Sequence, residues 1–206
     1  AVAVPDQATL EIAKRQLGKR FHGNGFLSAK EMLAKVRPGL TVVTMEGVNA
    51  PDAIRMALEA GSHVLTEKPS CTKLEQFEQL AKLAEKRERH LMLAMATRSG
   101  AALKKARRLI AAGAIGKPYS VSMVWIADQT RLTTKAYHAS WLADPKRAGG
   151  GKLIYHGIHY LDVYSMLLLY LGLEPIDIYL YQRPSVEMHR DHQFGFDPAN
   201  CDRCRA

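Results

Sequence analysis

The sequence predicts an α/β fold whose first half is built on a doubly wound parallel sheet. Short apolar, β-branched runs alternate with segments of helical periodicity from Ala1 to about Gly113. Consecutive parallel strands need crossover connections of this length, and helices usually supply them. Apolar residues make up 47% and charged residues 24% of the 206, so the chain can form a hydrophobic core rather than remain disordered.

Local signals mark the elements of the first half. Capping boxes, in which a Ser or Thr precedes a Glu by three positions, open two helices, at Ser28 and at Thr72. Pro51 begins another helix, and Gly18 and Gly61 end two of them. Strands are expected at residues 1–4, 40–45, 63–66 and 91–96. A first helix is expected from the helical spacing of Leu10, Ala13 and Leu17, and further helices at residues 28–36, 51–60, 72–88 and 101–112.

The pattern changes at Pro118 and predicts a second, α+β domain with an open sheet. The expected elements are a strand at residues 119–127, a glycine run at 149–151, an apolar helix at 158–171 and a strand at 176–183. Three regions are expected along the chain. They are a partial nucleotide-binding domain over residues 1–96, a partial α+β domain for substrate binding and oligomerisation over residues 97–183, and an irregular tail over residues 184–206.

The apolar helix at 158–171 is expected to bury one stripe of side chains. The spacing of three and four residues places Leu161, Ser165, Leu168 and Gly172 on one face.

Charge and cysteine content exclude several classes of protein. The net charge of +9 comes from 29 basic and 20 acidic residues. The basic residues are scattered through helical segments with no interleaved aromatic residues, so nucleic acid is not an expected partner. No apolar run is long enough to cross a bilayer. Three cysteines give no disulfide framework, which favours the cytoplasm.

Glu67, Lys68 and Pro69 stand together where the expected strand at 63–66 ends. In open α/β sheets, ligands bind beyond the carboxyl ends of the strands. This stretch is therefore either a solvated turn or part of an active site.

The glycine-rich turn of dinucleotide-binding folds, G-x-G-x-x-G, occurs nowhere in the sequence. The chain instead begins on what reads as the second strand of such a fold, with Asp6 at its end. An acid at that place accepts hydrogen bonds from ribose hydroxyls. We expect that the first strand-turn-helix unit, roughly 30 residues, is missing, which would leave an exposed sheet edge.

Four stretches together resemble one family. They are AVAVPDQ, ALEAGSHVLTEKPSCT, AAGAIGKPYSVSMVW and GGGKLIYHGIHYLDVYSMLL. Their order and approximate spacing resemble the Gfo/Idh/MocA (glucose–fructose oxidoreductase and inositol dehydrogenase) family of NAD(P)-dependent oxidoreductases, over Ala1 to about Arg183. The resemblance implies a Rossmann-type domain, here incomplete at its N-terminus, a C-terminal α+β domain and a homo-oligomer.

The resemblance also implies roles for single residues. Lys68 matches the active-site lysine, and His159 matches the histidine that donates or accepts a proton. Asp6 matches the ribose-binding acid, which favours NAD over NADP because a carboxylate repels a 2′-phosphate. The implied cofactor-binding set is Asp6, Thr44, Glu67, Lys68 and Arg98, and the implied substrate-binding set is Lys68, Tyr155 and His159.

These residue types suit hydride transfer to or from a sugar, inositol or related polyol. When hydride leaves a secondary alcohol, the hydroxyl proton must leave too. The imidazole of His159 can accept that proton, and the cation of Lys68 can stabilise the alkoxide. Taken alone, however, Lys68 also fits a surface lysine and His159 a core histidine.

Two departures from the family pattern keep an alternative open. Many members carry an aspartate four residues before the histidine, where this chain has Tyr155. The family also often has Pro-Asn after the strand at Thr44, where this chain has MEGVN. Either Tyr155 replaces the aspartate as the hydrogen-bond partner of His159, or this chain does not use a proton relay between the two positions. The alternative function is a non-catalytic binding or assembly protein that keeps the fold without the cofactor.

The tail holds four soft ligands, His189, His192, Cys201 and Cys204. Their order and gaps match no common zinc module, so no metal site is predicted.

Overall fold

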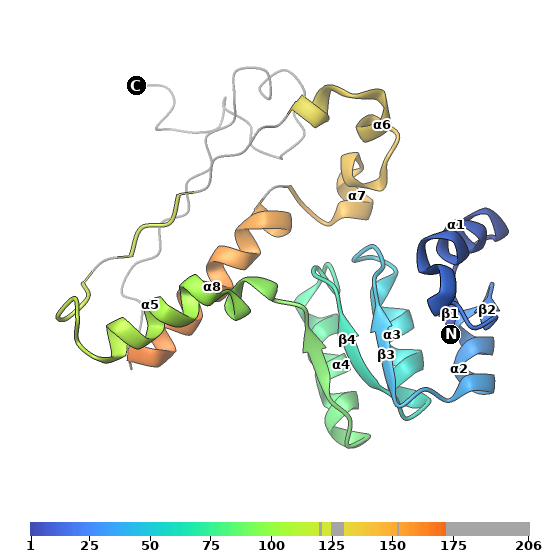
Figure 1. Cartoon of the computed structure of the whole chain (residues 1–206), viewed down its shortest axis with the longest axis horizontal. Helices are drawn as coiled ribbons and strands as arrows, with labels where there is room; N and C mark the ends of the chain where they lie inside the picture. Colours follow the sequence, from blue (N-terminus) through green and yellow to red (C-terminus); the bar gives the residue numbers. More distant parts are fainter. Residues whose placement is uncertain (120, 125–129, 152, 172–206) are drawn as a thin grey trace. The chain divides into compact units, whose positions relative to one another are not determined.

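The structure is a computed structural model that describes residues 1–119, 121–124, 130–151 and 153–171. The chain forms two compact units, Ala1–Ala94 (unit 1) and Met95–Ala206 (unit 2) (Figure 1). In the part of the chain described, no helix is long and apolar enough to span a membrane.

Unit 1 is a parallel α/β structure, as the alternating pattern predicts. Its strands are β1 (Val2–Ala3), β2 (Gly25–Phe26), β3 (Leu40–Val43), β4 (His63–Thr66) and β5 (Leu91–Leu93). Its helices are α1 (Gln7–Leu17), η1 (Gly18–Arg20), α2 (Ala29–Val36), α3 (Ala50–Glu59) and α4 (Leu74–Lys86). Every strand pair is parallel. Sequence reasoning missed β2, because Gly25–Phe26 lacks the β-branched run that marks a strand.

The sheet is divided into two parts, β1–β2 and β3–β4–β5, and no described strand joins β1 to β3. An exposed sheet edge was expected, and β1 and β3 each have one edge without a described partner strand. The face of β3–β4–β5 opposite α3 is also open, since Leu40 and Val42 are each 58% exposed and Met92 is 63% exposed. Val42 and Met92 share this face because both pair with Leu65.

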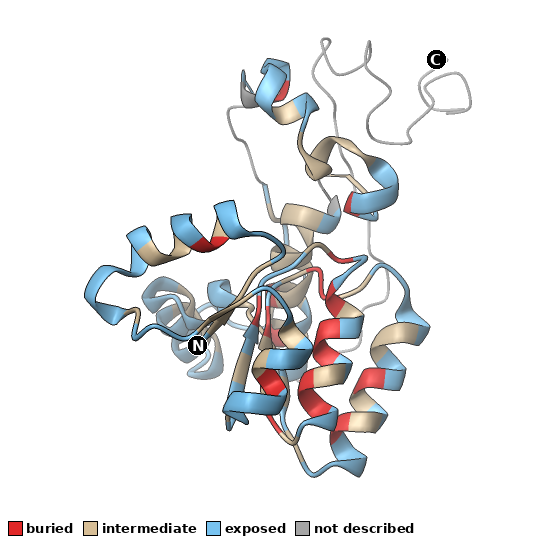
Figure 2. Cartoon of the chain, turned by 90° about the vertical axis from the view of Figure 1, so that its right-hand side faces the viewer, coloured by how far each residue is buried: buried red, intermediate tan, exposed pale blue. Residues whose placement is uncertain are grey.

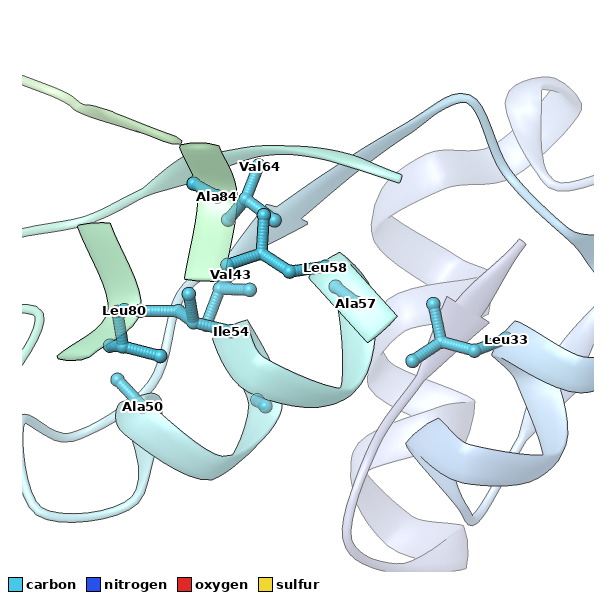
Figure 3. Close-up of a cluster of buried hydrophobic side chains, with 10 residues drawn as sticks. Leu33, Val43, Ala50, Ile54, Ala57, Leu58, Val64, Leu80 and Ala84 are labelled. Atoms are coloured by element: carbon cyan, nitrogen blue, oxygen red, sulfur yellow. The ribbon is translucent and has the colours of Figure 1, made fainter. Parts of the chain in front are cut away.

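Helix α3 forms the centre of the core in unit 1. Its buried residues follow the spacing of one helix face, and they are Ala50, Ala53, Ile54, Ala57 and Leu58. Ile54, Ala57 and Leu58 are fully buried. Figure 2 shows buried segments in red on the helices beside the sheet. They pack with Val43 and Val64 of the sheet, with Leu33 of α2 and with Leu80 and Ala84 of α4 (Figure 3).

The helix starts agree with the sequence signals at Ser28 but not at Thr72. Ser28 caps α2, because its hydroxyl accepts the Glu31 N–H at 3.3 Å. The predicted box at Thr72 is wrong: α4 begins after Lys73, without a side-chain cap. Thr72 instead faces the loop after β3, since a Cβ at Gly47 would be 3.4 Å from its Cγ2.

The regular elements in the described part of unit 2 are all helices. Its elements are η2 (Ala96–Ser99), α5 (Ala101–Ala111), η3 (Thr130–Thr133), α6 (Lys135–His138), η4 (Trp141–Ala143), α7 (Pro145–Ala148), η5 (Leu153–Gly157) and α8 (Ile158–Leu171). The strand expected at 119–127 does not form in its described residues. The strand expected at 176–183, the tail and its four soft ligands lie outside the described residues.

The buried face of α8 differs from the predicted stripe. Ser165 is exposed, and Leu161 and Leu168 are only half-buried, whereas Val163 and Met166 are buried. Gly172 lies outside the described residues. The reason is tertiary: α8 packs against α5, η2 and η5, and these contacts select a different side of a helix that is apolar all round.

We predict that Ile54→Ala lowers the free energy of unfolding by about 2–5 kcal/mol, because it leaves a cavity in a fully packed core. Chemical denaturation of the variant measures this. Ile12→Ala is the matched control, since Ile12 is 46% exposed on α1, and its effect should stay within about 0.5 kcal/mol. Equal effects of the two substitutions would contradict the assignment of α3 as the core.

Candidate active site

The carboxyl ends of β3, β4 and β5 lie at one edge of the sheet because the strands are parallel and in register. Val43 pairs with Thr66, and Thr66 pairs with Leu93. The ladder extends beyond β4, where the Glu67 N–H donates to the Val43 carbonyl and the Ala94 N–H donates to the Thr66 carbonyl, both at 2.9 Å. The backbone of Glu67 is therefore fixed by its neighbour strand, and Lys68 follows directly.

The turn after β4 is buried on one side and open on the other. Pro69 and Ser70 are buried, Lys68 is half-buried and Glu67 is exposed, and the Lys68–Pro69 peptide is cis. Gly47 lies against this turn: a Cβ there would be 3.2 Å from the Pro69 carbonyl oxygen. A glycine at position 47 thus lets the loop after β3 approach the turn closely, a role that sequence reasoning missed.

The two charged groups of this turn act on each other. Burial lowers the pKa of Lys68 below the ordinary lysine value, and the neighbouring charge of Glu67 opposes that change. The backbone N–H of Lys68 also donates a hydrogen bond to Glu67 Oε2 at 3.3 Å. A half-buried ammonium beside an exposed carboxylate can serve both as a hydrogen-bond donor and as a positive charge.

Asp6 follows β1 and caps α1. Its Oδ1 accepts the Thr9 N–H at 2.8 Å, and its Oδ2 accepts the Thr9 hydroxyl at 3.0 Å. The backbone hydrogen bond from Thr9 lowers the pKa of Asp6, so the exposed carboxylate is ionised at neutral pH. Thr44, directly after β3, is also exposed. The capping role of Asp6 was not predicted, although Asp is among the best capping residues.

Unit 2 carries the other predicted site residues. His159 lies in the first turn of α8 and is half-buried. The Tyr155 hydroxyl donates to the Ala148 carbonyl at 3.2 Å, and the Tyr155 ring contacts Trp141 at 5.6 Å between centroids. Lys68 belongs to unit 1, so its convergence with His159 is part of the proposal below.

Arg98, expected at the cofactor, lies in η2 and forms an ion pair with Asp162 of α8. Sequence reasoning missed Asp162. The signal was present, because a single carboxylate within the apolar helix IHYLDVYSMLLLYL requires a partner when the helix packs. Among the described residues, no group of three or more metal-ligating side chains comes together.

The glycine run at 149–151 shapes the turn between α7 and η5. Gly149 ends α7 with φ of 73°, a left-handed conformation that favours glycine. Gly150 packs tightly, because a Cβ there would lie 2.6 Å from Cγ1 of Ile154. These two glycines are therefore explained by the local backbone.

We predict that Glu67→Gln lowers the pKa of Lys68 further, because it removes the charge that opposes the effect of burial. Competitive acylation of the lysines across a pH series, read by mass spectrometry, measures this as a Lys68 profile shifted to lower pH. Glu11→Gln on α1 is the control and should leave the Lys68 profile in place. A shift to higher pH in Glu67→Gln would overturn this account of the turn.

Comparison with known proteins identifies both halves of the chain. A model of the oxidoreductase family with an NAD-binding Rossmann fold (Gfo/Idh/MocA) matches residues 2–95. A model of the Gfo/Idh/MocA C-terminal domain matches residues 103–191.

Curated relatives are similar over much of this chain. D-glucoside 3-dehydrogenase of Escherichia coli is 27% identical over 171 residues, which are 82% of this chain and 46% of that protein. An uncharacterized oxidoreductase of Schizosaccharomyces pombe is 29% identical over 137 residues, 66% of this chain and 36% of that protein. The chain thus spans less than half the length of these relatives.

Solved structures agree on the fold. The WlbA dehydrogenase of Bordetella pertussis, in complex with NADH and UDP-GlcNAcA, matches with a TM-score of 0.67 at 23% identity, over 81% of this chain and 46% of that one. The parallel unit 1 and the two family models lead to one assignment: the chain belongs to the Gfo/Idh/MocA family of oxidoreductases with an NAD-binding Rossmann fold.

Proposed function

We propose that this chain carries the site of an NAD(P)-dependent dehydrogenase that transfers hydride between the nicotinamide and a hydroxyl or keto group of a sugar, inositol or related polyol. The observation that carries the proposal is Lys68, a half-buried cation with a lowered pKa at the carboxyl edge of the sheet. The relative named a D-glucoside 3-dehydrogenase and the WlbA complex with NADH and UDP-GlcNAcA support a sugar substrate.

The residues present fit the ribose ends of a dinucleotide better than its diphosphate. Asp6 and Glu67 are exposed carboxylates at the ends of β1 and β4, and they would accept hydrogen bonds from ribose hydroxyls. Thr44, at the end of β3, would lie along the same edge. No glycine-rich phosphate turn occurs within these 206 residues. We therefore expect this chain alone to bind NAD weakly.

Lys68 and His159 would have separate roles at the substrate oxygen. The bound nicotinamide supplies a hydride acceptor or donor. Lys68 would donate a hydrogen bond to the substrate oxygen and stabilise its developing negative charge. His159 would accept the hydroxyl proton during oxidation and return it during reduction.

In this scheme Tyr155 would line the substrate side of the site and would not act as an acid. Its hydroxyl already donates to the Ala148 carbonyl, and its ring contacts Trp141. The phenol oxygen can still accept a hydrogen bond from a sugar hydroxyl. This role would place an aromatic face beside the substrate, where many relatives have a carboxylate.

We predict that Lys68→Ala lowers kcat by on the order of a hundredfold or more, the scale for losing one positioned electrostatic group, while NAD affinity changes much less. The assay uses this chain fused behind a strand, glycine turn and helix that supply the phosphate site. Reduction of NAD is followed with a panel of sugars and inositols.

Lys82→Ala, an exposed lysine of α4, is the matched control and should leave kcat unchanged. A fused protein that oxidises a polyol with full activity after Lys68→Ala would refute the role of Lys68. A fused protein that neither binds NAD nor oxidises any polyol would favour the alternative, a non-catalytic binding or assembly protein.

We predict that Asp6→Ser raises the affinity for NADP relative to NAD in the same fused protein, because it removes the charge that repels a 2′-phosphate. Serine preserves the cap of α1, so the helix should remain intact. Fluorescence titration with both cofactors measures the ratio, and circular dichroism checks the helix. An unchanged NAD to NADP ratio would argue against contact between Asp6 and the ribose.

A further inference from the structure

Arg98 and Asp162 form a two-point ion pair within unit 2. The Arg98 Nε donates to Asp162 Oδ2 at 2.5 Å, and a second guanidinium nitrogen, Nη2, contacts Oδ1. This fork geometry is the strong arrangement for an arginine–carboxylate pair. The Asp162 side chain is only 9% exposed, whereas that of Arg98 is 48% exposed. The hydrogen bond that Arg98 donates to Asp162 raises the pKa of Arg98.

The pair joins segments that are far apart in the sequence. Arg98 belongs to η2, and Asp162 lies 64 residues later in α8. One helical turn further along α8, Met166 Sδ accepts a weak hydrogen bond from Arg107 of α5 at 3.9 Å. The start of α8 is thus held by η2 and its next turn by α5. Both contacts lie on the side of α8 that packs inward.

His159 precedes Asp162 by three residues, and residues three apart lie on neighbouring positions of one helix face. A contact that fixes Asp162 therefore fixes the rotation of the turn that carries His159. We infer that Arg98 and Asp162 are positioning residues, in which Arg98 neutralises the Asp162 carboxylate and holds the turn that presents His159. This inference rests on the proposed role of His159, and it gives Arg98 a task other than contact with the cofactor.

The burial of Asp162 favours this assignment over direct cofactor binding by Arg98. A carboxylate with 9% exposure is costly without a countercharge, so withdrawing Arg98 toward a nucleotide would leave that charge buried and unsatisfied. Both oxygens of Asp162 are met by the guanidinium fork. Lysine, with a single point charge, would balance the charge but could not hold both oxygens in this geometry.

Other charges around α8 have to be considered because the test reads the titration of His159. The elements packed against α8 are η5, α5 and η2. They contribute His156, Arg107 and Arg98, while Lys104, Lys105 and Arg108 of α5 are exposed. None of these groups is altered when Asp162 is substituted, so a change in that variant reports on the pair.

The experiment follows His159 by NMR in the 206-residue chain with ¹³C-labelled histidine, and its signal is assigned with His159→Gln. Removing the cation by Arg98→Leu leaves the Asp162 charge in place and should raise the His159 titration midpoint. Asp162→Asn leaves the Arg98 charge in place and should lower it. Each shift should be about half a pH unit, the effect of one charge at ~6 Å in water. The double variant should titrate near the wild-type midpoint.

The conservative variant separates charge from geometry. Arg98→Lys should keep the titration midpoint but speed hydrogen exchange of the amides at 162–165 by about tenfold, because the fork is lost. The double variant Glu31→Gln, Lys35→Gln removes an exposed pair on α2 and is the matched control for both readouts.

Two results would overturn the inference. One is an unchanged His159 midpoint in both Arg98→Leu and Asp162→Asn. The other is a shift of the same sign in both, which would indicate general loosening rather than loss of opposite charges. Neither the His159 titration nor the amide hydrogen exchange requires bound cofactor or turnover. The inference can therefore fail while the proposed function stands, and the proposed function can fail while the inference stands. If Arg98→Leu does not fold, Asp162→Asn and Arg98→Lys still decide the question.

Discussion

The parallel pairing of β3, β4 and β5 over helix α3 is the constraint on which the candidate site in unit 1 depends. Ile54 and Leu58 of α3 are fully buried, and they pack with Val43 of β3 and Val64 of β4. Because all three strands run the same way, the chain leaves each of them at one edge. The backbone bond from Glu67 to Val43 then fixes where the next residue begins. The position of Lys68 is therefore set by the core rather than by a mobile loop.

The division of the sheet into two parts explains the uneven burial of unit 1. A parallel sheet is normally covered by helices on both faces. Here α3 and α4 cover one face, and the other leaves Leu40, Val42 and Met92 largely exposed. A further parallel strand between β1 and β3 would pair with both open edges, and the helix after it would cover the apolar face. That is the geometric reason for attaching a strand, glycine turn and helix when cofactor binding is assayed.

Much of unit 1 could be predicted from the sequence because its signals are local. The four predicted strands and the buried spacing of α3 lie within short windows, and Ser28 caps its helix as predicted. The failures involve long-range contacts. Thr72 faces the loop around Gly47, and α8 presents Val163 and Met166 inward because of its contacts with η2 and α5. A pairing across 64 residues, such as that of Arg98 with Asp162, leaves only an indirect mark: one acid in an apolar helix.

Arg98 and Lys68 show how local electrostatics separates a structural cation from one suited to chemistry. Two guanidinium nitrogens of Arg98 meet a poorly exposed carboxylate, and the pair raises the pKa of an already permanent cation. Lys68 differs because its countercharge, Glu67, is exposed to solvent and only partly opposes the effect of burial. An arginine held in a fork has to leave its carboxylate before it can meet an incoming oxygen anion, and that would leave the Asp162 charge unsatisfied. This constraint on Arg98 supports Lys68 as the group that would face the substrate oxygen.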